Sequence, residues 1–199
     1  MSHDAAFPVV ICFYTLDTPY EQEVLNLIAS CKKWGVEFLV EGVHSRGTWE
    51  ENCSYKPTFI LEKLETLKRA VFWADADSVF LKKPDFSPFL SCDISVRTME
   101  IFQNDPRYSL NTASFFANYT PKAVELVKAW HQECIRYPTT SFLDQIALYH
   151  VLKKTQDILV HPMPVAYCKI YDLDVFFLND GDVILEQTQA SRRHRSFFN

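Results

Sequence analysis

Two aspartates, Asp75 and Asp77, follow an apolar stretch, residues 71–74, with only Ala76 between them. Alternate residues of an extended chain point to the same side, so both carboxylates can direct oxygen atoms into one spot. Two negative charges this close repel each other unless a positive charge lies between them. Mg²⁺ or Mn²⁺ binds such oxygen ligands and completes its coordination with water and phosphate oxygens. The pair predicts a divalent cation that holds a phosphorylated ligand; the alternative is two solvated turn residues.

A lysine, Lys56, directly precedes Pro57, and a proline in this setting predicts the start of a helix. A positive charge at a helix N-terminus is unfavourable by roughly 0.3–1 kcal/mol, and a bound anion would reverse that sign. We therefore interpret Lys56 as a phosphate contact, with an ordinary surface lysine as the alternative. In the loop before it, Arg46, Trp49 and Asn52 could line the same site, although Trp49 could equally be a packing anchor.

The elements that must position these residues alternate along the first half of the chain. Strands are predicted at 8–14, 36–43 and 70–74, helices at 18–34 and from Pro57 to 68, and a polar loop at 44–55. This alternation predicts an α/β fold with a mixed, mostly parallel sheet, helices on both faces, and ligands at the carboxyl ends of the strands. Asp75 and Asp77 lie at such an end.

The first helix carries its own start and stop signals. Thr18 is predicted as its cap, Pro19 as its first residue, Glu21 as the reciprocal capping partner and Gly35 as its stop. Further along, strands are predicted at 92–96 and 112–118, and helices at 120–136 and 141–154. With no repeat or linker in its 199 residues, the chain is predicted to form one domain, residues 1–199.

Composition excludes several classes of protein. A net charge of −5 and a pI near 5.7 argue against a nucleic-acid-binding surface. Arg192 or Arg193 could still bind a diphosphate; the alternative is that they belong to a frayed basic tail. Six cysteines without a CxxC pair predict free thiols in a reducing compartment. With neither a signal peptide nor a membrane span in the sequence, we expect a cytoplasmic protein.

Four segments carry a resemblance to a known family. In chain order they are FYTLDTPYEQEVLNLIASCKKWGVEFLVEG, GTWEENCSYKPTFILEKLE, VFWADADSVFLKKPD and FLDQIAL. Together they resemble the small nucleotide-diphospho-sugar transferases of the GT-A glycosyltransferase fold, over roughly residues 8 to 195. The resemblance implies a nucleotide-sugar-binding part at about 8–118 and an acceptor side at about 119–199. It also implies transfer of a hexose, most often from UDP, to a glycan or another hydroxyl acceptor, with Mn²⁺ or Mg²⁺.

The resemblance also implies roles for particular residues. It makes Tyr14 and Thr15 the nucleotide-base and ribose side; the alternative for Thr15 is an ordinary strand-to-helix connection. Asp75 and Ala76 are expected to contact the donor as well. It places Asp144 and Gln145 against the reacting sugar and the acceptor, whereas spacing alone would make Asp144 a helix-capping partner of Ser141. A neutral amide such as Gln145 suits retention of anomeric configuration. Inversion would need a carboxylate base, which Asp144 could supply.

Two positions depart from the family pattern. Many relatives have a glycine near the sugar where this chain has Ala113 and Ser114. Many also supply a histidine as a third metal ligand where this chain has Gln187 and Thr188, which leaves His194 as the candidate third ligand.

Two other functions compete with glycosyl transfer. A sugar-phosphate nucleotidyltransferase usually has a glycine-rich, basic loop after the first strand, but FYTLDTPYE contains neither a glycine nor a base. A nucleotide-sugar or cation-binding module without turnover is the second alternative. The departures at Gln187 and Ala113 favour it.

Overall fold

The structure is a computed structural model that describes residues 7–99, 105–136, 143–171, 174 and 180–198. Its strands are β1 Val9–Thr15, β2 Phe38–Val43, β3 Val71–Ala74, β4 Ser78–Phe80, β5 Ile94–Thr98, β6 Leu110–Ala117, β7 Val160–Pro162, β8 Lys169–Ile170 and β9 Leu185–Gln187. Its α-helices are α1 Tyr20–Trp34, α2 Trp49–Ser54, α3 Lys56–Leu67, α4 Pro121–Arg136, α5 Leu143–Lys154 and α6 Ala190–His194. Short 3₁₀ turns are η1 Ser87–Phe89, η3 Val165–Tyr167, η4 Asp180–Asp182 and η5 Arg195–Phe198.

A six-stranded sheet in the order β2-β1-β3-β6-β5-β7 forms the centre of the fold. β1 runs parallel to β2 and β3, whereas β6 runs antiparallel to both of its neighbours, and β7 returns to a parallel pairing with β5. This confirms the predicted mixed, mostly parallel sheet. A smaller sheet, β4-β9-β8, joins the chain after β3 to the C-terminal part.

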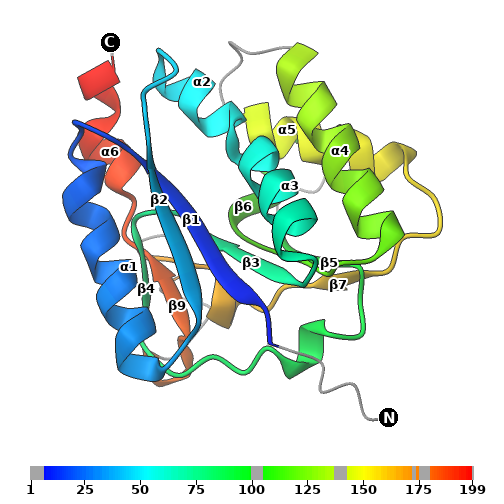
Figure 1. Cartoon of the computed structure of the whole chain (residues 1–199), viewed down its shortest axis with the longest axis horizontal. Coiled ribbons are helices and arrows are strands. Elements are labelled where there is room, and N and C mark those ends of the chain that lie inside the picture. The colour runs from blue at the N-terminus through cyan, green and yellow to red at the C-terminus, as the bar shows by residue number, and fades with distance from the viewer. Residues whose placement is uncertain (1–6, 100–104, 137–142, 172–173, 175–179, 199) are drawn as a thin grey trace.

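Helices cover both faces of the large sheet, as predicted. Val10 and Phe72 point to the side of α1, where Leu27 is fully buried, whereas Ile11 and Trp73 point to the side of α3, α4 and α5. Figure 1 shows α1 on one side of the sheet and the other three helices together on the opposite side. The continuous apolar run of β1 is explained by this double cover, because a strand packed on both faces has no solvent side.

The ends of α1 show one wrong and one confirmed prediction. The expected capping pair between Thr18 and Glu21 does not form. The Thr18 hydroxyl oxygen accepts from the Tyr20 N–H at 3.3 Å, while Glu21 accepts from the N–H of Asp17, which lies in the left-handed region with φ 58°. This early turn lets the chain reverse before the helix begins. Gly35 ends the helix as predicted.

Gly35 is expected to be hard to replace because of its backbone conformation. It has φ 65°, where a side chain costs roughly 1–2 kcal/mol, and an added Cβ would meet no atom within 4 Å. Gly35→Ala should therefore lower the free energy of unfolding by about 1 kcal/mol in urea denaturation. Gly181→Ala is the matched control, since its Cβ also meets nothing and its φ is outside that region. An equal loss at both positions would contradict the explanation.

The predicted polar loop at 44–55 is partly wrong, because residues 49–54 form the short helix α2. Its start is marked by a capping box: the Glu51 N–H donates to the Thr48 hydroxyl at 3.2 Å, and the Thr48 N–H donates to the Glu51 carboxylate at 2.7 Å. The signal was present in the sequence as Thr-x-x-Glu. A six-residue helix is too short to show an apolar period, so pattern analysis passes over it.

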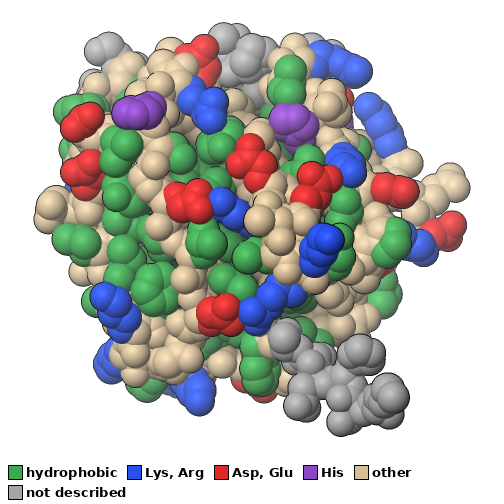
Figure 2. All heavy atoms as spheres, viewed as in Figure 1, with side chains coloured by type: hydrophobic (Ala, Val, Ile, Leu, Met, Phe, Trp, Pro, Cys, Tyr) green, Lys and Arg blue, Asp and Glu red, His purple; other side chains and the backbone are tan. Residues whose placement is uncertain are grey.

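Three general expectations can be compared with the described residues. All six cysteines are free, as predicted, five of them buried and Cys53 half-buried. In Figure 2 acidic and basic side chains are interspersed over the face shown, with no broad basic field on it. Among the helices of the described residues, none is long and apolar enough to cross a bilayer.

Candidate active site

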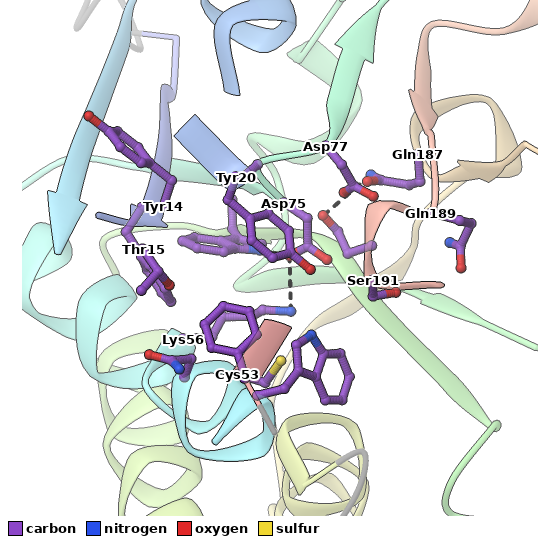
Figure 3. Close-up of a pocket in the computed structure, with 17 residues that line it drawn as sticks. Tyr14, Thr15, Tyr20, Cys53, Lys56, Asp75, Asp77, Gln187, Gln189 and Ser191 are labelled. Carbon is purple, nitrogen blue, oxygen red and sulfur yellow. Dashed lines mark hydrogen bonds and ion pairs between the residues drawn. The ribbon is translucent and has the colours of Figure 1, made fainter. Parts of the chain in front are cut away.

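Asp75 and Asp77 lie in the turn that links β3 to β4, not in an extended segment as the alternation argument assumed. The Ser78 N–H donates to the Asp75 backbone oxygen at 3.0 Å, which closes the turn. Both side chains nevertheless line one pocket of about 130 Å³, here called the first pocket, at the end of the sheet where β1 finishes. Figure 3 shows this pocket, with the ammonium of Lys56 directed at Asp75.

Asp75 is held by two donors on the same oxygen. Its Oδ1 accepts from the Trp73 indole N–H at 2.7 Å and lies 3.1 Å from the Lys56 ammonium. Burial raises the pKa of this carboxyl to about 6; Lys56 counters the rise, while Asp77 adds to it. Within the described residues, Oδ2 of Asp75 receives no hydrogen bond.

Asp77 holds the C-terminal part of the chain. Its Oδ2 accepts from the Ala190 N–H at 2.7 Å, and its backbone oxygen accepts from the Thr188 N–H at 3.1 Å. Burial raises the pKa of Asp77 as well, and the Ala190 N–H partly offsets that rise. The charged form of each acid is therefore costly in the absence of a further positive charge.

Lys56 is buried and bridges two carboxylates. Its ammonium lies 2.8 Å from Asp144 and 3.1 Å from Asp75, and it donates to the backbone oxygen of Thr112 at 3.1 Å. Burial alone would lower the pKa of Lys56, but Asp144 and Asp75 outweigh it, so the pKa is raised. The structure thus shows a paired lysine inside the protein, which excludes the alternative of a surface lysine. Its role as a phosphate contact stays a prediction.

Asp144 and Gln145 open the helix α5 and face a second pocket of about 500 Å³. Asp144 is 5% exposed, and its Oδ2 accepts from the Thr112 hydroxyl at 2.7 Å in addition to its ion pair with Lys56. Gln145 donates to the backbone oxygen of Arg107 at 2.9 Å. The capping alternative for Asp144 involves Ser141, which lies outside the described residues.

The two pockets adjoin each other. They share several lining residues: Trp49, Cys53, Lys56, Asp75, Ala113, Gln189 and Ser191. Arg192 lines the second pocket, as Gln145 does, but not the first. A molecule in the first pocket would therefore meet a molecule in the second beside Lys56 and Asp75.

The other residues predicted for the site differ in how directly they meet the first pocket. Thr15, Trp49 and Ala76 line it. Tyr14 lines it too, but Figure 3 shows its ring directed toward β2 and away from the two acids. Asn52 also lines it.

The side-chain amide of Asn52 is engaged by its own loop. Its oxygen accepts from the Arg46 N–H at 2.9 Å, and its nitrogen donates to the Thr48 backbone oxygen at 2.8 Å. Arg46 itself stacks over the Tyr55 ring, 3.5 Å from the centroid, and is not among the lining residues of either pocket. Asn52 therefore shapes the loop in front of α2.

The candidate third ligand, His194, is placed elsewhere in this structure. Its Nε2 lies 2.8 Å from Glu23 on α1, and Arg193 binds the same carboxylate oxygen at 2.9 Å. The described residues contain no cluster of three or more His, Cys, Asp or Glu side chains able to hold a metal ion. The structure therefore does not join His194 to Asp75 and Asp77.

Gln187 takes the place where a histidine was expected. It is 1% exposed; its amide oxygen accepts from the Ser78 hydroxyl at 2.8 Å and its nitrogen donates to the Ser114 hydroxyl at 3.1 Å. It ties β9 to β4 and β6 while lining the first pocket. Ala113, the other departure, lines both pockets.

Several residues that line these pockets were not predicted from the sequence. The first pocket is also lined by Tyr20, Cys53, Gln189, Ser191 and Phe198, and the second by Asn111 and Tyr108. Tyr20 lies within the helix predicted at 18–34, and nothing in its sequence neighbourhood distinguishes it as a pocket residue. No local signal marks the C-terminal residues, because a pocket wall built from a tail depends on where that tail docks.

The residues present fit a divalent cation. Asp75 and Asp144 both pair with the ammonium of Lys56, and Asp77 lines the same pocket as Asp75 and Lys56, so the carboxylates here outnumber the ammonium. Two of these carboxylates line one pocket, and hard oxygen donors are what Mg²⁺ and Mn²⁺ prefer. Water and phosphate oxygens would have to complete the coordination, since the described residues supply no third ligand.

Comparison with known proteins agrees with this geometry. Residues 11–192 match the model of a family described as nucleotide-diphospho-sugar transferase. One similar solved structure is a glycosyltransferase involved in the glycosylation of the major capsid of PBCV-1, 17% identical with a TM-score of 0.68, covering 96% of this chain and 99% of that one. Another is the apo form of mouse xyloside xylosyltransferase 1, 10% identical with a TM-score of 0.55, covering 92% and 98%. These likenesses show a GT-A-like fold. None of the curated protein sequences matches the chain significantly.

Proposed function

Because the chain belongs to the nucleotide-diphospho-sugar transferase family, we propose that it is a glycosyltransferase that depends on Mn²⁺ or Mg²⁺. It moves a hexose from a nucleotide diphosphate, UDP in the simplest case, to a hydroxyl group of a glycan or another acceptor. The donor occupies the first pocket and the acceptor occupies the second. The first pocket also takes residues from the C-terminal part of the chain, so the donor site extends beyond the predicted range of about 8–118.

The observation that carries the proposal is the charge of the first pocket. Lys56 is already paired with Asp144 and Asp75, so it does not offer a free positive charge to a diphosphate. Two unit charges of the same sign 4 Å apart repel by roughly 4 kcal/mol near a protein surface. A diphosphate beside Asp75 and Asp77 therefore needs a divalent cation between them, and these two acids are the residues that would hold it.

The reaction breaks the bond between the anomeric carbon and the diphosphate oxygen and forms a bond to the acceptor oxygen, with release of the hydroxyl proton. A cation bound by Asp75 and Asp77 supplies charge that stabilises the departing diphosphate. The chain's own residues position the reactants. Lys56 fixes the side chains of Asp75 and Asp144, and Gln145 presents its amide to the second pocket.

Retention of anomeric configuration is supported by the state of Asp144. An inverting enzyme needs a carboxylate that can take the acceptor proton. Asp144 is nearly buried, and the same oxygen, Oδ2, accepts from the Thr112 hydroxyl and pairs with the Lys56 ammonium, so that oxygen is already engaged and does not face an acceptor. Gln145 beside it is a neutral amide with no basic oxygen.

Release of free nucleotide diphosphate from a panel of nucleotide sugars, with Mn²⁺ and a set of glycan acceptors, tests the proposal. We expect release of nucleotide diphosphate from at least one donor, and we expect chelation with EDTA to abolish that release. NMR of the product should show that the transferred sugar keeps the anomeric configuration it had in the donor. Binding without release from any donor would instead identify a binding module without turnover, the reading that Gln187 and Ala113 favour. Activity that survives chelation would contradict metal dependence.

We further propose that the protein works in a reducing compartment, the cytoplasm. All six cysteines are free, and burial raises the pKa of the Cys31 thiol to about 12 and that of the Cys168 thiol to about 11. Such thiols are inert because the reactive thiolate is scarce at neutral pH.

A further inference from the structure

The C-terminal segment, residues 188–198, forms part of the wall of both pockets. Gln189 and Ser191 line both, Phe198 lines the first and Arg192 lines the second. The helix α6 within this segment has five residues, too few to be stable without outside contacts. The position of this wall therefore depends on what holds the segment against the rest of the fold.

One end of the segment is held inside the site. The Thr188 and Ala190 N–H groups donate to the backbone and the carboxylate of Asp77. Ala190 is fully buried, so the beginning of the segment is well anchored.

The other end is held by a residue that lines neither pocket. Oε1 of Glu23, in the first turn of α1, accepts from the Arg193 guanidinium at 2.9 Å and lies 2.8 Å from His194 Nε2. The Glu23 side chain is 16% exposed, less than a typical surface acid. Burial would raise the pKa of Glu23, but Arg193 and His194 outweigh it and hold the pKa below its usual value.

Tyr20 places an aromatic ring beside this contact. Residues three apart in a helix lie on the same face, so Tyr20 and Glu23 face the segment together. The Tyr20 ring centroid is 6.0 Å from that of His194 and 6.2 Å from that of Phe198, and Tyr20 lines the first pocket. The first turn of α1 therefore offers the segment both an ion-pair partner and an aromatic surface.

We propose that Glu23 is a positioning residue, which holds the C-terminal segment so that Phe198 and Tyr20 form an aromatic wall of the donor pocket. This inference rests on the proposed function, because the ligand concerned is the nucleotide sugar. Without Glu23 the segment would be less firmly held, and a bound donor would have to draw it back to this position at the expense of binding free energy. Loss of Glu23 therefore acts on donor affinity and leaves the chemical step intact.

Glu23→Gln removes the charge and keeps the shape of the side chain. We expect the KM for the donor to rise about threefold to tenfold, with kcat unchanged within about twofold, as for the loss of one partly exposed charged hydrogen-bond pair. Trypsin should also cut faster after Arg192 and Arg193, as followed by mass spectrometry, and bound donor should slow that cleavage. Glu65→Gln is the matched control, because Glu65 pairs with Lys128 on a distant helix surface.

An unchanged KM in Glu23→Gln would overturn the proposal, whether or not trypsin cuts faster, and so would a fall in kcat at constant KM.

Phe198→Ala provides an independent variant at the end of the chain, where the folded core is not touched; it should raise the donor KM with Glu23 intact. If the wild-type protein binds no nucleotide sugar, the proposed function fails instead. Tryptic cleavage then still reports whether Glu23 holds the segment.

Discussion

The double variant Asp75→Asn, Asp77→Asn is expected to lose donor turnover almost entirely, with kcat/KM at least about a thousandfold lower. Asparagine keeps the size of each side chain and removes both negative charges. The cation then loses both of the anionic side chains proposed to hold it, and Lys56, the cationic residue among the described residues that line the first pocket, stays paired with Asp144. Isothermal titration should show that donor binding no longer depends on Mn²⁺.

The same variant is expected to fold normally, which separates loss of binding from loss of structure. Burial raises the pKa of both acids, so the folded protein already disfavours their charged forms. Removing the charges should change the free energy of unfolding of the metal-free protein by no more than about 1 kcal/mol. Asp182→Asn is the matched control, because Asp182 is exposed and is not a lining residue of either pocket. Donor affinity that is unchanged in the double variant would refute the assignment of both acids.

Lys56→Met is expected to cause the largest loss of stability, about 3–5 kcal/mol in urea unfolding. The Lys56 side chain is 8% exposed, and so is that of Asp144. Without the ammonium, the side-chain contacts that remain within the described part of the chain are the Thr112 hydroxyl on Asp144 and the Trp73 indole on Asp75. A carboxylate left buried without a counter-charge must be desolvated or protonated, and both cost free energy.

Two further variants test the cause of that loss. Lys56→Met combined with Asp144→Asn should be more stable than Lys56→Met alone, because it removes the carboxylate that was left without a partner. Lys128→Met breaks an ion pair with Glu65 in which both side chains are about half exposed, so it should cost less than about 1 kcal/mol. A similarly small loss in Lys56→Met would show that the buried pairing does not support the fold.

Local patterns in the sequence determined most of the first half of the fold. The apolar run of β1, the proline at the start of α3 and Gly35 at the end of α1 each act within a few residues, so they can be recognised without knowing the fold. The capping box of α2 was equally local, and only its short length hid it. By contrast, the antiparallel insertion of β6 between β3 and β5 depends on pairings between strands far apart in the chain.

The candidate site divides in the same way. The two acids after β3 could be predicted, because their residue types and spacing are a property of a short segment. Their surroundings could not: Lys56 meets Thr112 across 56 positions, Asp77 meets Ala190 across 113, and Glu23 meets Arg193 across 170. The sequence alone therefore determined the residue types that the site offers, two carboxylates directly after a strand. The tertiary structure decided which charged side chains pair with each other and that residues 188–198 form part of the pocket wall. Such contacts exist only once the sheet and the helices are packed together.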